Sequence, residues 1–261
     1  MPPVFLPDLR LNASLEGPAN APAVVMIHGL GGALSVWDGV AALLPRHRLL
    51  RMDLRGHGLS DVPPAPYAMG TLIRDVERLI DHFALKETVL LGVSLGGLIA
   101  QGLAVKRLDL VRGLVLSNTA ARIGTAAQWH DRIATVREHG LTALADTTMA
   151  RWMGRGWRDN PALPKLRQDL LRTEPQGWMG AAAAIAGTDF YETTATLRLP
   201  TLAIAGANDG STPPDLVRET AELIAGARFQ LIRGSGHLPM VENPAEYARI
   251  LGDFLTSIGH S

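Results

Sequence analysis

Short apolar runs alternate along this chain with segments of helical periodicity, and this alternation constrains the fold more than any other feature. The runs are four or five residues long and rich in Val, Ile and Leu, as is typical of strands covered on both faces of a sheet. They lie at residues 23–27, 49–52, 89–93, 113–116, 201–205 and 229–232. Helical patterns fall at residues 35–44, 69–83, 95–106, 213–224 and 244–258. This order predicts an α/β protein with a mostly parallel sheet flanked by helices.

The alternation stops between residues 121 and 191, where helical segments follow one another without a convincing strand. We expect helices at residues 126–139, 141–152, 164–173 and 177–186. A helical stretch between two strands of one sheet is typical of a cap over the sheet edge, so we expect a core of residues 1–120 and 192–261 and a cap of residues 121–191. Four of the five tryptophans lie in this cap, where aromatic surface packs a small core or lines a pocket. They are Trp129, Trp152, Trp157 and Trp178.

The composition excludes several classes of protein. The chain has 25 basic and 25 acidic side chains and no cysteine. A nucleic-acid-binding protein usually carries a basic excess, and the missing thiols exclude disulfides, thiolate metal sites and a catalytic cysteine. The longest apolar runs fall well short of the roughly 20 residues of a membrane span, and the N-terminal residues lack the pattern of a signal peptide. We therefore expect a soluble, cytoplasmic protein with a small-molecule partner and neither nucleic acid nor a membrane; its oligomeric state is not predicted.

One serine stands at a sharp junction between a strand and a helix. The apolar run at residues 89–93 leads directly into Gly92-Val93-Ser94-Leu95-Gly96, and a helical pattern begins at Leu95. A serine in such a turn has its hydroxyl pushed clear of the sheet, and the small glycines allow strand and helix to approach closely. We therefore interpret Ser94 as a nucleophile.

A serine hydroxyl needs a base that removes its proton as it attacks. Of the eight histidines, His237 lies between the last strand and the final helix, where a loop can reach over Ser94. His28 and His57 are interpreted as residues that shape their glycine-containing loops. The other histidines are assigned to the cap (His130 and His139) or to the surface (His47, His82 and His260). His237 is the predicted base.

The base in turn needs a carboxylate that orients it. Asp209 follows the strand at residues 201–205, at the sheet edge where an α/β protein builds its site. After the preceding strand the chain reads Ser117-Asn118-Thr119, with no acid. The chain order of Ser94, Asp209 and His237 is typical of a hydrolase triad.

A tetrahedral intermediate also needs hydrogen-bond donors for its oxyanion. The segment His28-Gly29-Leu30-Gly31-Gly32 follows the strand at residues 23–27 and places backbone over the serine. The N–H groups of Leu30 and Leu95 are the expected donors. This chemistry requires neither a metal nor an organic cofactor.

Together these motifs resemble the α/β-hydrolase family over nearly the whole chain. The resemblance rests on the His28 loop, the segment Asp53-Leu54-Arg55-Gly56-His57-Gly58-Leu59-Ser60, the turn at Ser94, and the residues Asp209 and His237. It implies an α/β-hydrolase fold with a mostly parallel eight-stranded sheet flanked by helices and a helical cap insertion.

Three further segments are similar to the 3-oxoadipate enol-lactonases of the bacterial β-ketoadipate pathway, in aromatic catabolism. They are residues 117–125 with Trp129 and Arg132, residues 206–214, and Gly236-His237-Leu238-Pro239. The resemblance implies a carboxylic ester hydrolase that opens a five-membered enol lactone bearing a carboxymethyl arm. Arg132 or Arg122 would then pair with the substrate carboxylate, and Trp129 and Trp152 would line the pocket.

Other activities use the same triad, and they stay open at this point. A general carboxylesterase and a cofactor-free perhydrolase would both attack through Ser94. A small-molecule receptor built on a hydrolase scaffold is an alternative from a different class of function, in which a ligand binds under the cap without turnover.

Overall fold

The computed structural model describes residues 3–153 and 159–261, and its centre is one seven-stranded sheet. The strand order is β3 (Ala13–Glu16), β5 (Arg48–Met52), β4 (Ala23–Ile27), β6 (Thr88–Val93), β7 (Val111–Ser117), β8 (Thr201–Gly206) and β9 (Arg228–Ile232). Only β3 runs antiparallel to its neighbour. Every residue of β4, β6 and β8 is buried. The near-continuous apolar runs therefore correspond to strands covered on both faces, as predicted.

The expected count of eight strands is corrected to seven. A hairpin of β1 (Val4–Leu6) and β2 (Leu9–Leu11) forms its own two-stranded sheet. The chain then turns at Asn12, whose carbonyl accepts a hydrogen bond from the Asp53 N–H (2.9 Å), and β3 pairs with β5 instead. The chain therefore enters the main sheet at β3, after the hairpin.

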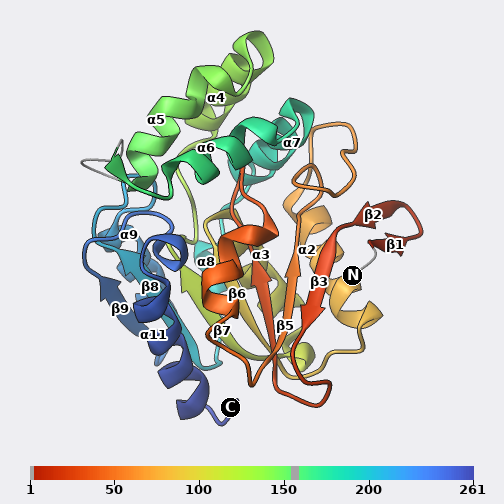
Figure 1. Ribbon diagram of the computed structural model, residues 1–261, viewed down its shortest axis with the longest axis vertical. Helices are drawn as coiled ribbons and strands as arrows, with labels where there is room; N and C mark the ends of the chain where they lie inside the picture. The colour runs from red at the N-terminus through yellow and green to blue at the C-terminus, as the bar shows by residue number, and fades with distance from the viewer. Residues whose placement is uncertain (1–2, 154–158) are drawn as a thin grey trace.

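Helices cover both faces of the sheet (Figure 1). They are α1 (Asp38–Ala41), α2 (Met69–His82), α3 (Leu95–Lys106), α8 (Tyr191–Thr194), α9 (Pro214–Glu222), α10 (Pro239–Glu242) and α11 (Pro244–Ser257), with short 3-10 turns η1 (Leu34–Trp37) and η2 (Leu108–Leu110). The single helix expected at residues 35–44 is instead η1 followed by α1. It ends early because Leu44 precedes Pro45, and a residue before proline avoids helical backbone.

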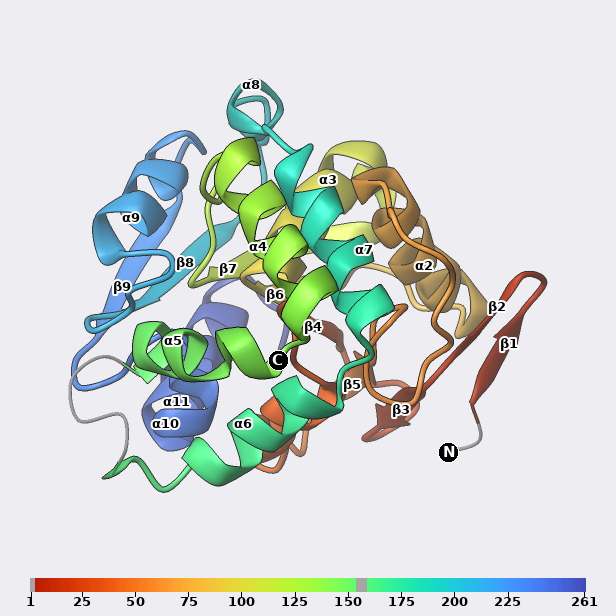
Figure 2. The same cartoon turned by 90° about the horizontal axis from the view of Figure 1, so that it is seen from above.

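The helices α4 to α7, which follow β7 in the chain, cover the carboxyl ends of the strands (Figures 1 and 2). They are α4 (Ala126–His139), α5 (Thr142–Met153), α6 (Leu163–Arg172) and α7 (Pro175–Ala186), and each begins within two residues of its predicted start. Helix α4 packs against α7 and α5, and α5 against α6. The division into core and cap stays a prediction, and Trp157 lies outside the described residues.

Two histidines were expected at the surface and are buried instead. His47 Nε2 lies 3.0 Å from the carbonyl oxygen of His260, and His260 Nε2 lies 2.9 Å from that of Ala23. These contacts fasten the end of the chain to the start of β4, a long-range arrangement that no local pattern indicates. Within the described ranges, no helix is long and apolar enough to cross a bilayer.

Candidate active site

Ser94 lies at the tip of a tight turn between β6 and α3. Its φ of 55° and ψ of −118° place it in the left-handed region, which costs a non-glycine residue about 1–3 kcal/mol. The Ser94 N–H donates to the carbonyls of Ser117 (3.1 Å) and Asn118 (3.2 Å), and the Thr119 hydroxyl donates to the Ser94 carbonyl (2.7 Å). These contacts with the end of β7 hold the strained turn in place.

Gly92 and Gly96 are required because neighbouring backbone carbonyls lie too close to leave room for a side chain. A Cβ on Gly92 would lie 2.2 Å from the carbonyl oxygen of Gly96, and a Cβ on Gly96 would lie 2.1 Å from that of Ile27. No side chain fits at either position, so the G-x-S-x-G spacing follows directly from the packing of α3 on β4 and β6.

His237 and Asp209 meet beside this turn. His237 Nδ1 lies 2.8 Å from Asp209 Oδ2, and both side chains are buried. Burial alone would raise the pKa of Asp209, but His237 and the hydrogen bonds from Asn118 and Ser211 outweigh it and hold that pKa below its ordinary value. Asp209 is therefore a carboxylate at neutral pH, able to orient the imidazole and to stabilise its protonated form.

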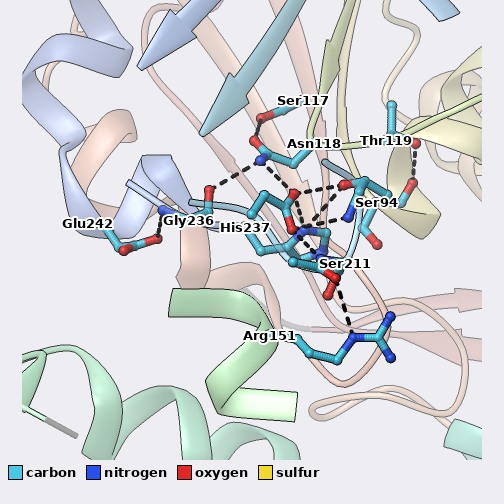
Figure 3. Close-up of polar contacts among 12 residues, drawn as sticks. Ser94, Ser117, Asn118, Thr119, Arg151, Ser211, Gly236, His237 and Glu242 are labelled. Atoms are coloured by element: carbon cyan, nitrogen blue, oxygen red, sulfur yellow. Dashed lines mark hydrogen bonds and ion pairs between the residues drawn. The ribbon is translucent and has the colours of Figure 1, made fainter. Parts of the chain in front are cut away.

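Several donors around Asp209 were not singled out from the sequence. Asn118 Nδ2 donates to Asp209 Oδ2 (2.9 Å), as does the Thr212 hydroxyl (2.8 Å), while the N–H groups of Ser211 (2.7 Å) and Thr212 (3.1 Å) donate to Oδ1. Asn118 Nδ2 also donates to the Gly236 carbonyl (3.2 Å), next to His237 (Figure 3). The sequence signal that could have found Asn118 is its place directly after a buried strand, at the same sheet edge as Ser94 and Asp209.

The loop that carries His237 is held from a further side by Glu242. Glu242 Oε1 accepts a hydrogen bond from the Gly236 N–H (2.9 Å), as Figure 3 shows. Burial raises the pKa of Glu242, although the backbone donors of Gly236 and Leu238 oppose the shift. The Gly236 peptide is thus bonded at its carbonyl by Asn118 and at its N–H by Glu242.

The glycine loop after β4 is shaped by two buried histidines. His28 Nε2 accepts from the Leu54 N–H (2.9 Å), and its Nδ1 lies 2.7 Å from the Gly29 carbonyl. His57 Nε2 accepts from the Gly31 N–H (3.0 Å), and its Nδ1 lies 3.1 Å from the Arg55 carbonyl. Both rings therefore carry their proton on Nδ1, and both shape the loop, as the sequence indicated.

This loop leaves backbone donors free beside Ser94. The N–H groups of Leu30 and Leu95 make no hydrogen bond with any other described residue. Leu95 is the first residue of α3, where a helix has no internal acceptor for its N–H, and Leu30 lines the cavity next to Ser94. Two unpaired backbone N–H groups are the kind of donor that an oxyanion requires, and their role as such stays a prediction.

A cavity of about 310 Å³ lies between the sheet edge and the helices above it. Ser94, Leu30 and His237 line its floor, and Trp129, Arg132, Trp152 and Trp178 contribute from α4, α5 and α7. Ser94 Oγ and His237 make no hydrogen bond to each other in the described structure. Catalytic hydrogen bonds of this kind commonly tighten only when substrate is bound.

Arg132 is the most distinctive group in the wall of the cavity. Its guanidinium carbon lies 4.5 Å from the Trp129 ring centroid and 5.7 Å from that of Trp178. Burial, assisted by the neighbouring Arg151, lowers the pKa of Arg132 to about 10, so it is charged at neutral pH. No carboxylate of the described residues forms an ion pair with it.

The other predicted cap residues lie in different surroundings. Trp152 stacks on the His237 ring at 5.9 Å between centroids and 23° between planes. Trp129 donates from Nε1 to the Ile123 carbonyl (2.6 Å). Arg122 lies outside the cavity lining, is exposed, and pairs with Asp189 at 3.4 Å. Arg151 lines the cavity and was not singled out from the sequence.

The described residues bring together a serine, a histidine–carboxylate pair and two free N–H groups, a set that can support acyl transfer. No group of three or more potential metal ligands occurs among them. Fold and site together define a class, the α/β hydrolases, and the chain belongs to this family: residues 22–244 match the family described as alpha/beta hydrolase fold.

Among its relatives, 3-oxoadipate enol-lactonase 2 of Acinetobacter baylyi is 33% identical over 243 residues, which cover 92% of this chain and 91% of the relative. The crystal structure of the enol-lactonase from Burkholderia xenovorans LB400 is similar with a TM-score of 0.93 and 33% identity, over 98% of this chain and 100% of that one. A thermophilic esterase from Thermogutta terrifontis has a TM-score of 0.91 and 28% identity, with 97% and 95% coverage. These relatives support a hydrolase that acts on small molecules.

Proposed function

We propose that this protein is a serine hydrolase that opens a carboxylate-bearing enol lactone of the 3-oxoadipate enol-lactone type. We infer the substrate class from the position of Arg132. It is a cation held against two tryptophan rings in the cavity that contains Ser94 and His237, and no carboxylate in the described part of the chain pairs with it. Desolvated arginine binds carboxylates strongly, because both partners of the hydrogen bonds are charged.

In the proposed mechanism, Ser94 Oγ attacks the lactone carbonyl while His237 takes its proton. Asp209 stabilises the imidazolium, and the Leu30 and Leu95 N–H groups bind the oxyanion. Collapse of the intermediate breaks the ring C–O bond, and His237 protonates the departing enol oxygen. Water, deprotonated by His237, then releases the acyl group from Ser94. The released enol tautomerises to the ketone, which makes ring opening effectively irreversible.

The relatives named as enol-lactonases support this substrate, and the relative named as an esterase supports the wider class of carboxylic esters. A comparison of kcat/KM on 3-oxoadipate enol lactone and on an aryl acetate separates the two. We expect a clear preference for the lactone, and Ser94→Ala should lower turnover of both substrates by several orders of magnitude. A preference for the acetate would leave an esterase, and unchanged turnover in Ser94→Ala would remove the mechanism.

Arg132→Gln tests the carboxylate contact in the same assay. A hydrogen bond between charged groups contributes about 1.5–3 kcal/mol, so kcat/KM for the lactone should fall roughly ten- to hundredfold while that for the acetate changes little. Arg137→Gln, an exposed arginine on the same helix, is the matched control. An equal loss on both substrates would show that Arg132 supports the fold of the cap instead of binding the carboxylate.

A further inference from the structure

The C-terminal end of α5 contacts the loops that carry both Asp209 and His237. The Arg151 carbonyl accepts a hydrogen bond from the Gly210 N–H (2.9 Å), and the Trp152 carbonyl accepts one from the His237 N–H (2.5 Å). The last four carbonyls of a helix have no partner within the helix. Two of these carbonyls in α5 are therefore bonded by backbone next to, or within, the candidate triad.

Glycine is present where this contact is closest. A Cβ on Gly236 would lie 1.9 Å from the Trp152 carbonyl oxygen, a distance that no side chain can occupy. A Cβ on Gly210 would lie 3.1 Å from the Arg151 carbonyl oxygen. Asn118 and Glu242 also bond the Gly236 peptide (Figure 3). The hydrogen bond from the His237 N–H to the Trp152 carbonyl holds the histidine loop from a third side.

The same helix end is electrostatically suited to a cation. The C-terminus of a helix carries a partial negative charge, which stabilises a nearby positive group. The indole of Trp152 adds the negative face of an aromatic ring, stacked 5.9 Å from the His237 ring. Both features favour the imidazolium that forms when the Ser94 proton is transferred.

We propose that the end of α5, at Arg151 and Trp152, is a positioning element for His237 and Asp209, so that the helices above the sheet contribute to the chemical step as well as to substrate choice. This inference rests on the serine mechanism proposed above. If α5 positions His237 and Asp209, it should raise the rate of hydrolysis of every ester, including one too small to reach Arg132. The effect should therefore appear in kcat for an aryl acetate and leave KM for that substrate nearly unchanged.

Two variants of the full-length protein test the proposal, with kcat and KM measured separately on an aryl acetate. Trp152→Ala removes the stacked ring, and we expect kcat to fall about tenfold, which corresponds to a cation–π contact between the exposed and the fully desolvated range. Gly236→Ala forces the histidine loop away from the Trp152 carbonyl, and a displacement of about 1 Å should lower kcat roughly hundredfold. Gly252→Ala, on α11 where an added Cβ meets no atom within 4 Å, is the matched glycine control and should keep wild-type activity.

Melting temperature and circular dichroism show which variants fold. If Gly236→Ala does not fold, kcat of Trp152→Ala alone tests the proposal. Wild-type kcat on the acetate in the folded variants, with any loss confined to KM for the lactone, would overturn the proposal. Ser94→Ala separates the two levels of inference. If it is inactive while Trp152→Ala keeps wild-type kcat, only the role of α5 fails, whereas full activity in Ser94→Ala removes the mechanism itself.

Discussion

Asn118 joins the two loops of the candidate triad through one amide group. Its Nδ2 donates to Asp209 on one side and to the Gly236 carbonyl on the other, and the Ser117 hydroxyl donates to its Oδ1 (3.2 Å). The residue is fully buried and has a φ of 44°, a conformation that asparagine tolerates better than most side chains. The amide therefore fixes the separation between the acid and the loop of the base.

Asn118→Ala should lower both stability and turnover. The substitution leaves Asp209 Oδ2 with one donor fewer in a buried site, which costs about 1–3 kcal/mol of unfolding free energy, and we expect kcat to fall roughly tenfold. Asn118→Asp should cost more, because it places a second carboxylate against Asp209. Urea unfolding measures the loss of stability, and kcat on an aryl acetate measures the loss of turnover. Asn208→Ala, at the exposed residue next to Asp209 in the chain, is the control and should keep wild-type values. Wild-type values in Asn118→Ala would show that the amide is dispensable.

Single residues were predictable where a local pattern carries the chemistry. Ser94, Asp209 and His237 each follow a strand with a distinctive flanking sequence. In the structure Ser94 and His237 line one cavity and Asp209 bonds to His237, while their catalytic roles stay a prediction. Asn118 differs, because its importance depends on partners 91 and 118 residues away in the chain. Such contacts are set by the tertiary fold, and a sequence without the fold gives no measure of them.

At the scale of elements, the start of α4 is defined by its own sequence. The Thr125 hydroxyl accepts from the Gln128 N–H (3.3 Å), and Gln128 Oε1 accepts from the Thr125 N–H (3.0 Å), which forms a capping box. Trp129 and Arg132 lie on the first turns of this helix. The Thr125–Gln128 capping box thus fixes the start of α4 and, with it, the position of the Arg132 backbone.

Thr125→Ala should lower the unfolding free energy by about 1 kcal/mol, the usual cost of removing a helix cap. In a chain of this length that corresponds to a decrease in Tm of roughly 2–4 °C. Thr135→Ala makes the same substitution within α4, where alanine is the better helix former, and should not destabilise the protein. Equal Tm values for the two variants would contradict a role for the Thr125 capping box in stability.

Elements were predicted well where periodicity is strong and less well where packing decides. The main helices begin within two residues of their expected positions, because apolar spacing and flanking prolines mark their ends. The strand count was wrong, since β1 and β2 pair only with each other, a choice that depends on where the chain turns after Leu11. The docking of α5 on the loops of Asp209 and His237 was not predicted at all, because backbone hydrogen bonds between elements leave no periodic signal.

At the scale of the whole molecule, charge is balanced and recognition is local. Equal numbers of acidic and basic side chains leave no net charge to attract an anionic substrate from a distance. Arg132 and Arg151 line the cavity together with Asp131 and Asp169, and Arg132 forms no ion pair with a described residue. Under the proposed function, preference for a carboxylate would depend on these side chains in α4 and α5, and changes elsewhere on the surface should leave it intact.

Stability of the whole molecule should fall on mild acidification, because neutral histidines are buried beneath the glycine loop. Burial, assisted by the neighbouring His28, lowers the pKa of His57 from 6.5 to about 3, and burial also lowers the pKa of His28. Between pH 6.5 and about 3, the unfolded chain therefore binds a proton at His57 that the folded chain does not. The stabilisation is complete above pH 6.5 and is lost as the pH falls, by about 1.4 kcal/mol per pH unit for one proton.

His57→Gln tests this contribution, because the glutamine Oε1 can accept the Gly31 hydrogen bond and carries no titrating group. We expect the free energy of unfolding, measured with urea at intervals from pH 7 to pH 4.5, to fall less steeply in the variant than in the wild type. The difference in slope should approach one proton. Asp75 and Glu242, whose pKa values burial raises, shift stability in the opposite direction but are present in both proteins, so their contributions cancel in the comparison. Parallel slopes in the two proteins would place the acid sensitivity elsewhere than at His57.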